Sequence, residues 1–188
     1  MTLGRRSRYA IPDVLGESAV RTIIQHALAG NPDAVAAADA NRSRTVVWDD
    51  FGDQVLVHLD SAQVRLVKSL AFVSVDFECE QTGRAPLIVT FAMGGVQDAA
   101  GLVATTDDVP RGHPLLAGRW GRTYQETVWA ALIGTARQHA SERGQVPQSI
   151  HVLDGHLRLA AVAPLALGAT ALKSFDAAFP GKRNGAPQ

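Results

Sequence analysis

The chain has 188 residues, 46% of them hydrophobic, and its 18 basic side chains balance its 18 acidic ones. This balance excludes a generic basic nucleic-acid-binding protein and an acidic solvating protein, and the hydrophobic content excludes a chain without a folded core. No apolar run is long enough to span a bilayer, and the single cysteine cannot form an internal disulfide. We therefore expect a cytoplasmic protein.

Composition along the chain predicts one folded domain over residues 13–179. A basic arm (1–12) precedes the domain, and a Gly- and Pro-containing tail (180–188) follows it; both are expected to lack fixed structure. The three arginines of the arm give too little charge for more than a weak, salt-sensitive contact with phosphates. Nucleic acid is therefore not an expected partner.

The first part of the domain has the apolar spacing of helices. A first helix is predicted over about 14–29, with Asp13 as its N-cap and Gly30 as its stop. Asparagine followed by proline then predicts a short alanine-rich helix over about 32–40. From Thr45 the apolar period changes from 3.6 to 2, which indicates β-strands.

This second region predicts a meander of four or five antiparallel strands that ends at Met93. Turn residues lie at 49–52, 60–61 and 82–86, and connections this short join antiparallel neighbours. The next segment, 94–122, is a long Gly- and Pro-rich connection in which only 101–106 has the pattern of a strand. Long connections of this kind in compact domains often carry function.

The last part of the domain is predicted as a helix over 124–143, a β-hairpin and a C-terminal helix over 165–179. Thr123 and Glu126 form a T-x-x-E capping box at the start of the first of these helices. Its expected apolar stripe comprises Trp129, Leu132, Ile133, Ala136 and Ala140, with Val128 at the edge. The Asp154-Gly155 pair indicates a type I′ turn, which pairs Leu153 with His156. The expected fold is α+β: an antiparallel meander sheet with helices on one face, followed by the hairpin and the C-terminal helix.

Three carboxylates, Asp76, Glu78 and Glu80, alternate along one strand and so lie on one face of it. On a solvated face such side chains merely repel one another, opposite the core residues of the same strand. In a cleft they could instead perform acid/base chemistry, and oxygen clusters also suit calcium or magnesium. This acidic strand face is one candidate site.

A second candidate lies in the long connection: Arg111, His113, Arg119, Trp120 and Arg122. Three arginines around a tryptophan could hold an anion, a nucleotide or an acidic peptide. The alternative is structural, with Trp120 holding the connection to the core and the arginines balancing Asp107 and Asp108.

Other reactive residues favour structural roles. Cys79 falls on the apolar side of its strand, where burial and nearby carboxylates would raise its pKa and suppress the thiolate. His151 and His156 are diagonal neighbours on the hairpin, but they lack a third zinc ligand, and Arg158 on the same face repels a cation. With no dinucleotide, P-loop, nucleophile-elbow or metal motif, we predict no cofactor and no metal.

The element order, and most closely the hairpin 149–160 with its following loop and helix, resembles the layout of the type III secretion chaperone-like and YbjN-like superfamily. The resemblance implies a small, dimeric, non-enzymatic binding protein. It supplies no catalytic residues. The chain differs from that layout in its zero net charge, its additional strands and the 94–122 connection.

We therefore expect a non-catalytic protein-binding or assembly protein that associates with itself, as a homodimer, or with a protein partner, and not with a membrane. One alternative is a small-anion-binding protein or acid/base enzyme that combines the acidic strand face with the arginine-rich connection. That alternative requires Asp76 or Glu78 to share a pocket with Arg119. Another is a structural subunit of a phage or secretion-system particle, for which a surface poor in charge is suited.

Overall fold

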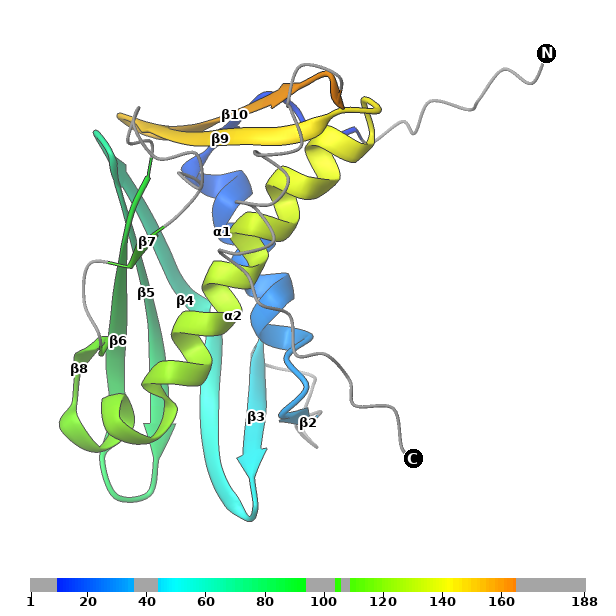
Figure 1. Cartoon of the computed structure of the whole chain (residues 1–188). Helices are drawn as coiled ribbons and strands as arrows, with labels where there is room; N and C mark the ends of the chain where they lie inside the picture. Colours follow the sequence, from blue (N-terminus) through cyan, green and yellow to red (C-terminus); the bar gives the residue numbers. More distant parts are fainter. Residues whose placement is uncertain (1–9, 36–43, 94–103, 106–108, 165–188) are drawn as a thin grey trace, which may run out of the picture.

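The computed structural model describes residues 10–35, 44–93, 104–105 and 109–164 (Figure 1). These residues form two helices and ten strands, as expected for an α+β fold. In chain order the elements are β1 (Val14–Gly16), α1 (Glu17–Ala29), β2 (Ala34–Val35), β3 (Thr45–Asp50), β4 (Asp53–Val67), β5 (Leu70–Cys79), β6 (Gly83–Ala92), β7 (Ala104–Thr105), β8 (Arg111–Gly112), α2 (Pro114–Ser141), β9 (Val146–Leu153) and β10 (His156–Val162).

The larger of two sheets is the predicted antiparallel meander. Its strand order is β2-β3-β4-β5-β6-β7, β8 also pairs with β6, and both helices lie on one face (Figure 1). The predicted turn at Asp60-Ser61 is wrong, because β4 continues through it with a break in register between His58 and Gln63. Ser61 makes the break possible: its hydroxyl accepts from the Asp76 N–H and donates to the His58 carbonyl. The chain turns later, at Lys68 and Ser69.

The N-terminal elements differ from the prediction at their edges. Helix α1 ends at Gly30 as expected, but it begins at Glu17, with Gly16 rather than Asp13 as its N-cap. Residues 14–16 pair with β10 instead, and pairing in a sheet removes them from the helix. Residues 34–35 form β2 rather than the predicted short helix, whose remaining residues lie outside the described part of the chain.

Helix α2 begins at Pro114, ten residues before its predicted start. The Gly and Pro residues that predicted a loop are compatible with the helix. Pro114 occupies its first turn. Gly121 leaves room for Pro110, because a Cβ added at position 121 would lie 2.9 Å from the Pro110 Cδ. The predicted capping box therefore lies inside the helix, where Glu126 pairs with Arg122. Parts of the former connection pair with β6 as β7 and β8, and β7 falls within the expected strand 101–106.

The smaller sheet has the order β1-β10-β9, and its hairpin confirms the predicted pairing of Leu153 with His156, which also places His151 opposite Arg158. It lies across the end of the large sheet near the C-terminal end of α2 (Figure 1). Backbone bonds join the two sheets: Ser69 N–H donates to the Val152 carbonyl at 3.1 Å, and Gly155 N–H to the Leu66 carbonyl at 3.0 Å. The predicted C-terminal helix and tail lie outside the described residues.

An aromatic cluster joins α2 to the inner face of the large sheet. The ring centroid of Trp48 lies 5.5 Å from that of Phe77 and 6.4 Å from that of Trp120, and Phe77 lies 5.2 Å from Tyr124. The Tyr124 hydroxyl donates to the Val73 carbonyl at 3.1 Å, and burial raises the pKa of this phenol well above its usual value. The buried stripe of α2 thus extends past the predicted one to Leu116, and Val128 is more deeply buried than Trp129.

Replacing Tyr124 by Phe tests this anchor. The substitution keeps the ring but removes the hydroxyl's hydrogen bond to the Val73 carbonyl, which also accepts a bond within the sheet, so we expect the free energy of unfolding to fall by about 0.5–1.5 kcal/mol. Tyr124→Ala should cost about 3–5 kcal/mol through the cavity. Urea unfolding measures both, with the exposed Leu115→Ala on the same helix as a control that changes stability little. A Tyr124→Phe variant as stable as the wild type would contradict the role of the hydroxyl.

Candidate functional site

The main cleft lies where two hairpins of the large sheet part. Pairing of β4 with β5 ends at Leu56 and Glu78, whereas β4 continues to Asp53 and β5 to Cys79. The tips of the β3–β4 and β5–β6 hairpins are therefore separate, and the first turns of α2 lie beside them (Figure 1). Between them is a cavity of about 770 Å³, called the hairpin cleft below. Its lining comprises Val47, 52–56, 78–81, Gly83, Leu115, Leu116, Arg119 and Trp120.

Backbone polar groups face this cleft. Phe51 and Gly52 both have positive φ, 56° and 92°, and form a two-residue turn between the paired Asp50 and Asp53. In such a hairpin, alternate residues exchange hydrogen bonds with the partner strand and those between them point away. The N–H and C=O of Gln54 therefore point away from β3, toward the cleft, at the position where pairing with β5 has ended.

Arg119 joins α2 to the tip of the β3–β4 hairpin. Its guanidinium lies 2.8 Å from an Asp50 carboxylate oxygen and 3.1 Å from one of Asp53, and it donates to the Asp50 carbonyl at 3.0 Å. The prediction that placed Arg119 and Trp120 in a loop is wrong, because both lie on α2. Trp120 is buried against Trp48, as the structural alternative expected, but Arg119 balances Asp50 and Asp53.

The other predicted arginine-site residues do not line the cleft. Arg111 lies on β8, His113 is the N-cap of α2, and Arg122 forms an exposed ion pair with Glu126 at 2.8 Å. Asp107 and Asp108 lie outside the described residues. Of the five predicted residues, the structure therefore brings only Arg119 and Trp120 into the cleft.

The three residues of the acidic strand face likewise do not all line the cleft. Asp76 pairs with Arg84 at 2.8 Å on the outer face of the sheet, while Glu78 and Glu80 line the cleft. Glu78 lies 2.8 Å from His58 Nε2, and Glu80, just past the end of β5, is exposed. The opposite face of β5 is buried, as predicted.

The cleft has a negative charge. Asp50, Asp53, Glu78 and Glu80 lie in or beside it, and the guanidinium of Arg119 is already bonded to two of these carboxylates. Such a site attracts a cationic group and disfavours an anion. Among the described residues, no group of three or more His, Cys, Asp or Glu side chains is placed to hold a metal ion.

Cys79 also lines the cleft, which corrects one expectation. The residue packs against the core but is only partly buried, and its Sγ lies 3.2 Å from the Thr82 hydroxyl. The pKa of this thiol is lowered, not raised, because its hydrogen bond with the Thr82 side chain outweighs the effect of burial. Cys79 is therefore a usable chemical probe of the cleft.

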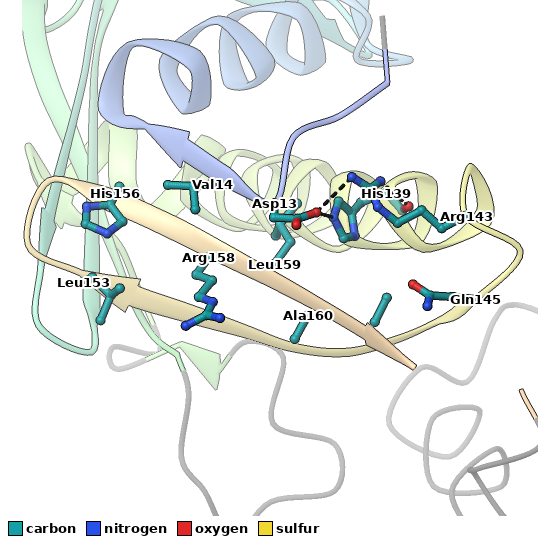
Figure 2. A pocket seen from close by; sticks show the side chains of 11 residues that line it. Asp13, Val14, His139, Arg143, Gln145, Leu153, His156, Arg158, Leu159 and Ala160 are labelled. Carbon is teal, nitrogen blue, oxygen red and sulfur yellow. Dashed lines mark hydrogen bonds and ion pairs between the residues drawn. The ribbon is translucent and has the colours of Figure 1, made fainter. Parts of the chain in front are cut away.

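A second hollow of about 630 Å³ lies at the other end of α2, along β10 (Figure 2). Its inner wall carries a cluster that sequence reasoning missed: Asp13 Oδ1 lies 2.8 Å from His139 Nε2 and accepts from Arg143 Nη2 at 2.9 Å. His139 is buried, and its Nδ1 has no partner within the described chain. No local pattern could reveal the cluster, because 126 positions separate Asp13 from His139.

This cluster holds the N-terminal segment on α2. Arg143 also donates to the Ile11 carbonyl at 2.9 Å, and the Glu142 carboxylate accepts from the Ile11 N–H at 2.8 Å.

The two histidines of the β9–β10 hairpin form only local hydrogen bonds: His151 with the Ser149 hydroxyl and His156 with the Asp154 carbonyl.

Comparisons of the chain with protein-family models, curated proteins and solved structures found no match. Neither helix in the described ranges combines the length and the apolar character needed to cross a bilayer. The functional assignment therefore rests on the chemistry of the two hollows.

Acid should release the N-terminal segment. The pKa of Asp13 is lowered, chiefly by its hydrogen bond with His139, and that of Glu142 is lowered by the Ile11 N–H. A carboxyl group with a depressed folded-state pKa stabilises the fold above its usual pKa, and this stabilisation is lost as the pH falls through the folded-state value. We therefore expect Asp13→Asn to lower the melting temperature at pH 7 and to flatten its decline below about pH 4.

Thermal unfolding between neutral and acidic pH, with hydrogen exchange at residues 11–14, measures this effect. Asp60→Asn, an exposed change of the same chemistry on β4, is the matched control. Equal pH profiles for Asp13→Asn and the wild type would rule out the proposed contribution of this carboxylate.

Proposed function

We propose that this chain is a non-catalytic protein-binding protein whose hairpin cleft receives an extended segment of a partner protein. The observation that carries the proposal is that β4 and β5 stop pairing at Leu56 and Glu78, toward their hairpin tips, and that a cavity lies between these tips. A cytoplasmic location and the chaperone-like character implied by the layout resemblance belong to the same proposal.

Open strand edges are natural binding sites for extended peptides, because a peptide adds main-chain hydrogen bonds to unpaired N–H and C=O groups. The backbone N–H and C=O of Gln54 are such a pair of groups at the cleft. Half-buried Val47 and Leu56 and the exposed Leu115 supply apolar contacts for alternate side chains. Backbone bonding gives affinity in this mode, while the side-chain contacts select the sequence.

The charge of the cleft favours a basic segment. Glu80 and Asp53 are exposed carboxylates at its rim, and rim charges mainly increase the association rate and discriminate against like-charged partners. We therefore expect the bound segment to alternate Lys or Arg with apolar residues.

The acid/base or anion-binding alternative receives less support. Glu78 and Arg119 do line one cleft, which that alternative required. However, Arg119 is held by Asp50 and Asp53, and an anion entering the cleft would have to displace these carboxylates. A peptide with cationic side chains needs no such exchange.

Selection from a random peptide library tests the proposal. We expect selected peptides to be basic and apolar in alternation, to bind the wild type, and to protect Cys79 from alkylation by a maleimide. Glu80→Lys should weaken their binding by about tenfold or more, because it replaces an attractive rim charge with a repulsive one.

The matched control is Asp60→Lys, which changes the charge equally on an exposed part of β4 that does not line the cleft. It should bind like the wild type. Selected peptides that leave Cys79 reactive and respond equally to both substitutions would refute a binding site in the cleft.

A further inference from the structure

We propose that this chain also binds a second copy of itself, head to tail: Phe51 at the β3–β4 tip of one copy enters the hollow of Figure 2 on the next. This self-contact goes beyond the proposed peptide binding, because it uses the hollow along β10 and not the hairpin cleft. Two features lead to it: an unfavourable exposed aromatic residue at the hairpin tip, and an exposed arginine, Arg158, beside the hollow, opposite in charge to the carboxylates near that tip.

Phe51 is unfavourable at its position in two respects, its exposure and its backbone conformation. It is fully exposed, and its φ of 56° is a left-handed conformation that bulky residues rarely adopt. A type I′ turn favours Asn or Gly at this position, so Phe costs stability in both respects. Exposed aromatic side chains of this kind act as anchors when a partner buries them.

The receiving hollow has the opposite character. On its outer side, Val14 pairs with Arg158 and Leu153 with His156 across the strands of the small sheet, so these four side chains form one block (Figure 2). Val14 and Leu153 are exposed apolar residues, at 49% and 41%. Arg158 is exposed and has no ion pair among the described residues.

The two surfaces complement each other. An aromatic ring fits between apolar side chains, and a guanidinium beside it adds a cation–π contact. When Phe51 enters the hollow, Asp53, two residues further along the hairpin tip, comes near Arg158 and His156; its side chain remains 71% exposed although it pairs with Arg119. Among the described residues that line the hollow, the one carboxylate is Asp13, which is already bonded to His139 and Arg143; Asp154, in the adjoining turn, accepts from the Lys68 N–H.

Geometry places the contact between copies rather than within one. The hairpin tips lie at one end of α2 and the small sheet at the other (Figure 1). The helix has 28 residues, which is about 42 Å at the usual rise per residue. Unlike surfaces at opposite ends produce a head-to-tail association that forms rings or open chains.

Two variants, each disabling one surface, test the inference. Phe51→Asn removes the ring and creates an Asn-Gly type I′ turn, so thermal stability should rise or stay level while association is lost. Arg158→Glu reverses the charge at the hollow. We expect each variant alone to sediment as a monomer at concentrations where the wild type associates, with an apparent dissociation constant at least tenfold higher.

An equimolar mixture of the two variants is decisive. The Phe51→Asn copy retains an intact hollow and the Arg158→Glu copy retains an intact Phe51, so the mixture should form a dimer that grows no further. Arg65→Glu, an exposed charge reversal on β4, is the matched control and should associate like the wild type.

A mixture that stays monomeric, or a wild type that is monomeric up to near-millimolar concentration, overturns the head-to-tail contact. Neither result bears on the hairpin cleft, whose peptide binding is scored separately through Glu80→Lys and Cys79 protection. Loss of peptide binding with intact association would instead overturn the proposed function and leave the self-contact standing.

Discussion

The packing around Trp48 determines how the parts of this molecule are arranged. Its ring lies fully buried against Phe77 of β5 and Trp120 of α2, and its indole N–H donates to the Leu28 carbonyl at the end of α1, at 3.1 Å. One side chain of the meander therefore contacts both helices. A buried indole needs a partner for its N–H, so this bond also fixes where α1 must end relative to the sheet.

The consequences extend along α2. Its N-terminal half is held to the sheet by Trp120, Tyr124 and the ion pairs of Arg119, and its C-terminal half leads to the small sheet. Because a helix is stiff over this length, the hairpin cleft and the hollow at β10 are placed at a fixed separation. The Asp13–His139–Arg143 cluster then fastens the N-terminal segment at the far end.

Sequence reasoning succeeded where structure depends on local periodicity and failed where it depends on tertiary contacts. Alternating apolar residues gave the meander, and Asp154-Gly155 gave the hairpin register to the residue. The sequence misplaces the start of α2, because Gly118, Gly121 and Pro114 are residues typical of loops. Gly121 is needed only once Pro110 packs against it, which no single segment reveals. Likewise, Ser61 has the character of a turn residue, and only its bond from the Asp76 N–H on the neighbouring strand explains its place within β4.

The candidate site was half predictable for the same reason. Carboxylates on alternate positions could be recognised, but the hairpin cleft exists because β4 and β5 stop pairing at Leu56 and Glu78, which is a property of two strands together. The sequence singles out Arg119 but not its partners Asp50 and Asp53, which are distant in the chain.

Phe51 shows what it means when a residue type does not suit its own local structure. In sequences that fold well, local conformational preferences agree with the tertiary structure. A residue that is disfavoured in its turn type and exposes an aromatic ring to water therefore points to a requirement outside the isolated fold. Several other residues of the described chain agree with their surroundings: Pro114 lies in the first turn of α2, Gly52 and Gly155 have the positive φ that their turns need, and the Trp48 N–H and Tyr124 O–H each donate to a carbonyl. The same logic separates Phe51 from Val35 and Val67, which are exposed in ordinary strand conformations and need no partner to explain them.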